Sequence, residues 1–185
     1  MRHEGTRRPA PFAVLVAATL VVWCAALVAA PVVAARAGTG GPVGPAVGAT
    51  TVYLAGRLVC HQRPTRSFHL AGHQLPVCAR CCGLYLGAAA GAVLAAARRR
   101  VASDDRRRLL WLAAAAIPTA ASLAVEWSGV AAPANLTRAL LALPLGAVAA
   151  WTFTVAACAD GGPSAGMAHR VSTAPRSNGG STTGV

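Results

Sequence analysis

Hydrophobic residues run along the chain in four long stretches, separated by segments that contain arginine, glycine or proline. The first stretch, residues 11–35, is 25 residues long and carries no charge. At about 1.5 Å per helical residue it can cross a hydrocarbon core of about 30 Å. Three further stretches cover residues 77–97, 109–127 and 136–158, and Pro118 is expected to kink the third. This pattern predicts an all-α protein, a multi-pass transmembrane helical bundle of about four spans over residues 11–158.

Both ends of the chain differ from this apolar region. Residues 1–10 form a basic tail, and Ala-Arg-Ala at 35–37 resembles a signal-peptide cleavage site. A signal peptide has an apolar core of only about 7–15 residues, so we expect a retained helix instead. Residues 159–185 are rich in glycine, serine, threonine and proline, which predicts a disordered tail.

A moderately apolar segment, residues 46–59, follows the first span. It is too short to cross a membrane and contains Arg57, which predicts an interfacial or re-entrant helix. A fifth span here is the alternative. It is disfavoured because it would move the arginine-rich loop at 98–108 to the outside.

The composition supports a membrane protein. Of the 185 residues 55% are hydrophobic and 12% are charged, whereas soluble domains carry about 25% charged residues. The net charge of +12 comes from arginines that flank the apolar stretches, so we expect contact with lipid and not with nucleic acid. All 17 basic residues are arginine, which, with the abundant alanine and glycine, indicates GC-rich coding and a bacterial source.

The arginine distribution predicts an orientation. With four spans, the amino terminus, the loop at 98–108 and the tail share one side and hold eleven arginines, against six on the other side. The richer side is expected to be cytoplasmic. We therefore expect a plasma-membrane protein with both termini in the cytoplasm and the loop between spans one and two outside.

That loop contains the most reactive side chains of the chain. Residues 59–83, VCHQRPTRSFHLAGHQLPVCARCCG, hold four cysteines and three histidines. Cys60 and His61 precede a Cys78-x-x-Cys81 motif, and thiolate and imidazole ligands suit zinc, copper(I) or iron. We predict a transition-metal site formed by Cys60, Cys78 and Cys81 together with His61 or His73.

Two other readings of the cysteines stay open. In an oxidising compartment Cys60 could form a disulfide with Cys78 or Cys81 and close the loop. Cys78 and Cys81 could instead exchange disulfides, with Arg80 lowering a thiol pKa. The motif lacks the histidine that covalent c-type haem requires.

The chain has further cysteines and histidines outside this predicted ligand set. Cys24 and Cys158 lie within spans and are expected to be buried apolar side chains. His69 and His73 would share a face if their segment were helical, although Gly72 weakens a helix there.

Polar and small residues elsewhere suggest supporting roles. Arg63 and Arg66 could bind an anionic ligand, and pairing with headgroups or capping of the segment is the favoured alternative. Glu126 and Arg138, at the outer ends of consecutive spans, are expected to form an ion pair. The small face formed by Gly83, Gly87 and Gly91 predicts close packing with a partner helix or with a second copy of the chain.

No nucleophile–base pair, paired carboxylates or phosphate-binding loop is present in the sequence. Whether the chain is an enzyme stays open, and a non-catalytic role is favoured; any catalysis would depend on the metal or the thiols.

Two stretches resemble a known family. The first motif, CHQRPTRSF followed by PVCARCCGLYLG, and the later EWSGVAAPANLTRALLALPLG resemble DUF2085, a family of small bacterial and archaeal membrane proteins. The resemblance covers about residues 53–150. It rests on Cys60, His61, Gln62, Pro64, Arg66, Ser67, Phe68, Pro76, Val77, Cys78, Arg80, Cys81, Gly83, Tyr85, Gly87, Asn135, Arg138 and Gly146.

The resemblance implies a multi-pass membrane protein and implies that Cys60, His61, Cys78 and Cys81 act as one unit. Cys82 stands where the family usually has threonine, which argues against Cys82 as an essential ligand. Pro144 stands where glycine is frequent. No activity follows from the family name.

Overall fold

The structure is a computed structural model that describes residues 11–40, 42–98 and 105–160. It contains five helices, one short 3₁₀ turn and one small hairpin. The helices are α1 (Pro11–Gly38), α2 (Val43–Val59), α3 (Ala79–Ala97), α4 (Asp105–Trp127) and α5 (Asn135–Asp160). The 3₁₀ turn η1 (Pro64–Arg66) and strands β1 (His69–Leu70) and β2 (His73–Gln74) connect α2 to α3. The all-α fold class is confirmed. The basic tail and nearly all of the predicted disordered tail lie outside the described residues.

Four of these helices are long and apolar enough to cross a membrane: α1, α3, α4 and α5. They coincide with the four predicted spans. Large apolar side chains point outward on them, among them Leu15 (63% exposed) and Ile117 (65% exposed). In water such a surface would be unfavourable, whereas lipid covers it. The protein is therefore a membrane protein with four candidate spans.

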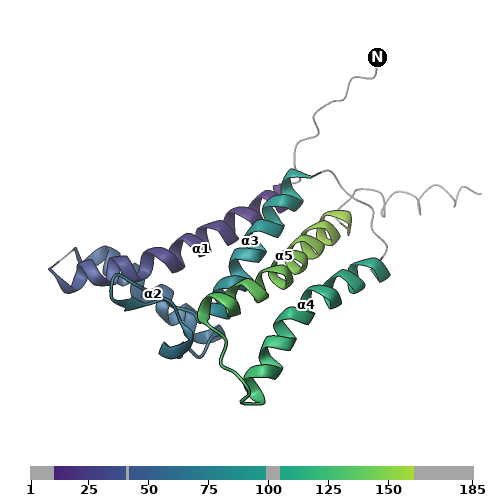
Figure 1. The fold of residues 1–185 in the computed structure, drawn as a ribbon. Coiled ribbons are helices and arrows are strands. Elements are labelled where there is room, and N and C mark those ends of the chain that lie inside the picture. The colour runs from purple at the N-terminus through teal and green to yellow at the C-terminus, as the bar shows by residue number, and fades with distance from the viewer. Residues whose placement is uncertain (1–10, 41, 99–104, 161–185) are drawn as a thin grey trace, which may run out of the picture.

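The spans alternate in direction (Figure 1). The start of α1, the end of α3, the start of α4 and the end of α5 lie at one end of the bundle. The opposite end carries α2, the hairpin and the start of α3 and α5. We call the latter the site end, because the cysteine segment lies there.

Helices α3 and α5 pack with their backbones in close contact. A Cβ atom added to Gly83, Gly87 or Gly91 would overlap the backbone carbonyl oxygen of Ala139, Leu143 or Ala147, respectively. Residue numbers increase in the same direction on both helices along this contact, so α3 and α5 run parallel. The four-residue spacing of the glycines matches the small-residue contacts typical of membrane helices. The partner helix predicted for the glycine face is thus α5 of the same chain, which covers that face.

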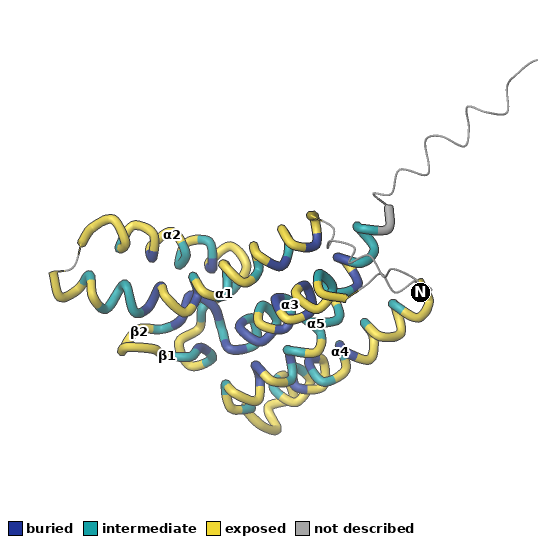
Figure 2. Tube along the Cα trace, turned by 90° about the horizontal axis from the view of Figure 1, so that it is seen from above, coloured by how far each residue is buried: buried dark blue, intermediate teal, exposed yellow. Residues whose placement is uncertain are grey.

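Helix α2 folds back along α1 at the site end (Figures 1 and 2). It is not among the helices long enough to span, so the four-span count is supported over the alternative of a fifth. Most of α2 is exposed, as Figure 2 shows, and its exposed residues include the large apolar Val43, Val47 and Leu58. Its inner side holds Gly56, where an added Cβ would overlap the carbonyl oxygen of Pro76.

The structure specifies two details of the cysteine segment. Residues His69 and His73 are not helical: they lie on opposite strands of the hairpin, in which His69 pairs with Gln74. The turn residues Ala71 and Gly72 both have positive φ, at 51° and 78°, as a two-residue hairpin turn requires. Helix α3 begins at Ala79 and not at 77, so Cys78 is its N-cap residue.

Candidate metal centre and ion-pair cluster

Three cysteine side chains meet at the site end. Cys60 is the C-cap of α2, Cys78 is the N-cap of α3, and Cys81 follows one turn later. Their Sγ atoms all lie within 4.8 Å of one another. The Sγ atoms of Cys78 and Cys81 are 3.5 Å apart, and the backbone N–H of Cys78 donates to Cys60 Sγ over 3.2 Å. Three sulfur atoms at this spacing can share one metal ion.

Two glutamine side chains hold Cys60 next to the start of α3. The amide nitrogen of Gln62 donates to the carbonyl oxygens of Tyr53 (2.9 Å) and Pro76 (2.6 Å). The amide nitrogen of Gln74 donates in turn to the Gln62 carbonyl oxygen (2.6 Å). Gln62 itself has a left-handed φ of 48°, which turns the chain sharply after the cysteine. These bonds therefore fix the ends of a 17-residue loop and keep the cysteines together.

The surroundings favour a thiolate at Cys78. A hydrogen bond from the Cys81 thiol lowers the pKa of Cys78 to about 5, and the backbone N–H groups of Arg80 and Cys81 act in the same direction, whereas burial opposes them. Its N-cap position also places the sulfur at the positive end of the α3 dipole. A thiolate is the form that binds metals.

All six cysteines are free thiols in the structure. The Cys78–Cys81 sulfur separation of 3.5 Å is well above the roughly 2.05 Å of a disulfide bond. Cys82 is buried in an apolar cluster with Leu27 and Val77 and does not join the three sulfur atoms. Cys24 and Cys158 are partly buried and also lie outside the group.

The group formed by the three cysteines contains no histidine of the described residues. His61, His69 and His73 are all exposed, and none of them joins a group of potential metal ligands among the described residues. His61 follows Cys60 directly and lines, with it and Arg57, a cavity of about 700 Å³. The structure thus brings together the three predicted cysteine ligands and leaves the two predicted histidine ligands, His61 and His73, outside the group.

A second polar cluster surrounds Glu126 near the end of α4. Its carboxylate, only 6% exposed, pairs with Arg66 (2.9 Å), Arg138 (3.1 Å) and Arg80 (3.2 Å). The predicted Glu126–Arg138 pair is confirmed, and η1 and α3 each add an arginine. The sequence carries a signal for this arrangement, because Glu126 is the only acidic residue between positions 106 and 159. Arg66, Arg80 and Arg138 therefore share one carboxylate at the site end.

Asn135, the first residue of α5, connects this cluster to the cysteine segment. Its side-chain oxygen accepts a hydrogen bond from Arg138 (2.9 Å), and its nitrogen donates to the Ser67 carbonyl oxygen (3.1 Å). Arg80 adds a second connection, since it lies between Cys78 and Cys81 in sequence and donates to Ser122 (3.1 Å) on α4. The thiol group and the ion-pair cluster thus share the first turn of α3.

Two archaeal proteins are similar to short stretches of this chain. An uncharacterized protein of Methanocaldococcus jannaschii is 50% identical over 40 residues, which are 22% of this chain and 26% of that protein. An uncharacterized protein of Methanothermobacter thermautotrophicus is 56% identical over 32 residues, 17% of this chain and 29% of that protein. The matched stretches therefore span less than a third of either relative. Both relatives are archaeal, so the bacterial source stays a prediction.

No solved structure matches the chain. The sequence profile of the DUF2085 family, described as predicted membrane proteins, matches residues 60–152, which include the three cysteines and the whole Glu126 cluster. This match covers half of the chain, and the protein therefore belongs to the DUF2085 family of predicted membrane proteins.

Proposed function

We propose that this membrane protein binds one transition-metal ion through Cys60, Cys78 and Cys81 at the site end of its bundle. The observation that carries the proposal is the convergence of three sulfur atoms within 4.8 Å, from residues up to 21 positions apart in sequence. Thiolate-rich sites suit zinc, copper(I) or iron better than magnesium or calcium. The two glutamines that fix the loop ends support a preformed site.

The fourth ligand decides what the ion does. His61, directly after Cys60, is the histidine best placed in sequence to complete a four-ligand structural site, with His73 as the second choice. A closed site would hold the cysteine segment on the bundle. An open position beside the cavity at Cys60 and His61 would instead allow exchange of the ion or thiol chemistry at the membrane.

Elemental analysis of the detergent-purified protein tests the metal site. We expect about one zinc, copper or iron ion per chain, lost in Cys60→Ser and in Cys81→Ser. Cys158→Ser is the matched control, because this cysteine lies at the far end of α5 and outside the group. Metal content that persists in Cys60→Ser would refute the assignment.

The two other readings of the cysteines predict different results. A disulfide-closed loop would show no metal and paired loss of free thiols, and His61→Ala would then change nothing. A thiol-exchange protein would accumulate a mixed disulfide at Cys78 when Cys81 is replaced by serine. Counting free thiols on the samples used for metal analysis distinguishes both from metal binding.

The orientation is a second part of the proposal. The arginine distribution supports an outward-facing site end in the plasma membrane, with both termini in the cytoplasm. A fluorescent protein fused after Val185 should then fluoresce, and alkaline phosphatase at the same position should be inactive. Active phosphatase at this position would show that the carboxyl terminus is outside and would contradict the predicted orientation.

A further inference from the structure

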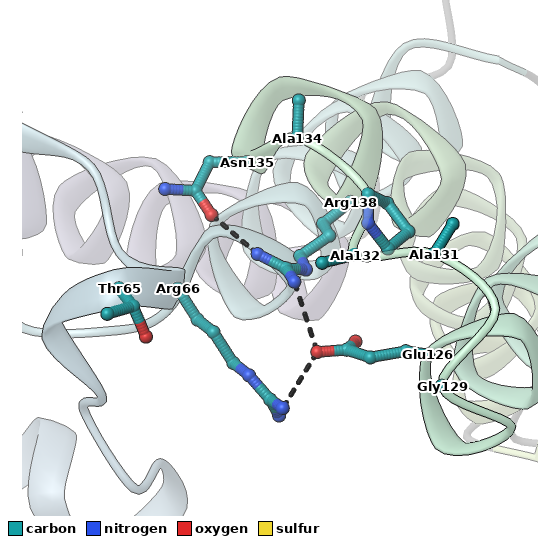
Figure 3. A pocket seen from close by; sticks show the side chains of 10 residues that line it. Thr65, Arg66, Glu126, Gly129, Ala131, Ala132, Ala134, Asn135 and Arg138 are labelled. Atoms are coloured by element: carbon teal, nitrogen blue, oxygen red, sulfur yellow. Dashed lines mark hydrogen bonds and ion pairs between the residues drawn. The ribbon is translucent and has the colours of Figure 1, made fainter.

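We propose that the cavity beside Glu126 binds a phosphate-class oxyanion through the guanidinium groups of Arg66 and Arg138. This cavity of about 550 Å³ lies between η1, the end of α4 and the start of α5 (Figure 3). It is distinct from the cavity beside Cys60, and the inference does not rest on the metal site.

The charge balance of the cluster leaves room for an anion. Three guanidinium groups face one carboxylate, so two positive charges are in excess. Glu126 and Arg138 are 6% and 7% exposed, a depth at which uncompensated charge is costly. No second carboxylate of the described residues pairs with these arginines. A bound oxyanion would reduce the excess, with Glu126 holding the guanidinium groups in position.

The arginine donors are suitably arranged. Figure 3 shows Arg66 and Arg138 reaching Glu126 from two different elements, so that both border the cavity. The Nε atom of Arg138 is buried and has no hydrogen-bond partner among the described residues. Arg66 is more open, at 37% exposed, and retains donors that do not contact Glu126. Planar guanidinium groups bind phosphate through paired N–H donors.

The lining of the cavity consists largely of small residues and includes the amino-terminal end of α5. The connection between α4 and α5 contributes small residues to the lining, including Gly129, Ala131 and Ala134. Asn135 begins α5 at the cavity, and the amino-terminal end of a helix attracts anions. The only acidic side chain in the lining is Glu126.

The phosphate has two possible sources: the phosphodiester of a lipid headgroup, or phosphate free in solution. The cavity lies at the ends of two candidate spans, where headgroups are found. Trp127, which is 81% exposed, directly follows the cavity residue Glu126 in sequence. Exposed tryptophans are enriched at membrane interfaces.

Calorimetric titration of the full-length protein in maltoside micelles tests the site. One titration uses inorganic phosphate, and a parallel one uses dioctanoyl phosphatidylglycerol. We expect saturable binding of at least one of them to the wild-type protein. Binding of the lipid alone assigns the headgroup, and binding of inorganic phosphate assigns a soluble ligand; both support the oxyanion site.

Arg66→Gln is the test variant and Arg63→Gln is its matched control. Arg63 precedes the same turn but neither lines the cavity nor pairs with Glu126. We expect binding at least about ten-fold weaker in Arg66→Gln, as loss of a charged hydrogen bond implies, and unchanged in Arg63→Gln. Equal affinities in the two variants, or no binding of either ligand to the wild type, would overturn the proposal.

Folding is checked by circular dichroism on each variant. If Arg66→Gln loses helicity, Ala131→Glu replaces it, because this exposed wall residue adds a negative charge to the cavity without removing an ion pair. Ala131→Glu should also weaken binding, and unchanged binding in a folded Ala131→Glu protein would contradict the site.

Discussion

Replacing Gly87 with alanine perturbs the close packing of α3 against α5. The added Cβ would overlap the Leu143 carbonyl oxygen and lie 3.0 Å from the Ala147 backbone nitrogen. Because these atoms belong to the backbone of α5, no side-chain rotation relieves the overlap, and α5 must move away from α3. That movement also loosens the contacts at Gly83 and Gly91 on the same face.

Two opposing terms set the size of the effect. Overpacking of a close-packed contact costs roughly 1–3 kcal/mol. Alanine also favours the helix over glycine by about 1 kcal/mol. We therefore expect Gly87→Ala to lower the free energy of unfolding by up to about 2 kcal/mol. The matched control is Gly48→Ala in α2, where an added Cβ meets nothing within 4 Å. The free energy of unfolding of Gly48→Ala should rise by up to about 1 kcal/mol, because only the higher helix propensity of alanine acts there.

The assay is unfolding in mixed micelles with rising SDS, followed by circular dichroism and tryptophan fluorescence. The two variants should shift the midpoint in opposite directions. Gly146→Ala gives an independent check, because its Cβ would overlap the Leu84 carbonyl oxygen from the α5 side. If Gly87→Ala were as stable as Gly48→Ala, α3 and α5 would not pack as described.

Three further predictions concern the site end. Glu126→Gln should lower the free energy of unfolding by about 3 kcal/mol, since it leaves the buried Arg138 without its carboxylate. Asp105→Asn, at a carboxylate 90% exposed, should change it by less than about 0.5 kcal/mol, and equal effects in the SDS titration would contradict the cluster. In chelator-treated protein, alkylation of Cys78 should be nearly independent of pH between about 6 and 8, because its lowered pKa keeps it a thiolate, and should slow as the pH falls toward about 5. A steep rise in its rate above pH 7, seen by peptide mapping, would show an ordinary thiol. Gln62→Gly relieves a left-handed φ but removes the two hydrogen bonds donated by the Gln62 side chain. The affinity for the metal, measured by chelator competition, should therefore fall roughly ten-fold. Unchanged affinity would show that Gln62 does not position Cys60.

The spans were predictable because continuous apolarity is a strong signal. The first helix begins at Pro11 and the third span ends at Trp127, both as predicted. The hairpin was not predictable from its histidines, because their i, i+4 spacing fits a helix equally well. What decides the structure there is the pair of positive φ angles at Ala71 and Gly72.

The candidate site was predictable in its chemistry but not in its full geometry. The cysteine ligands followed from the Cys60-His61 pair and the Cys78-x-x-Cys81 motif. Which histidine is near them depends on how the loop turns, and sequence spacing does not contain that information. The glycine face likewise predicted a partner helix without identifying it, because Ala139 and Ala147 are two of many alanines in the chain.

X-ray absorption spectroscopy on the metal of the purified protein tests the central claim most directly. For a zinc ion held by Cys60, Cys78 and Cys81, the spectrum should show three sulfur ligands at about 2.3 Å, with one nitrogen or oxygen ligand completing the shell. Cys81→Ser should lower the sulfur count or remove the metal, whereas Cys158→Ser should leave the spectrum unchanged. A shell of nitrogen and oxygen ligands alone, or a metal-free protein, would contradict the account.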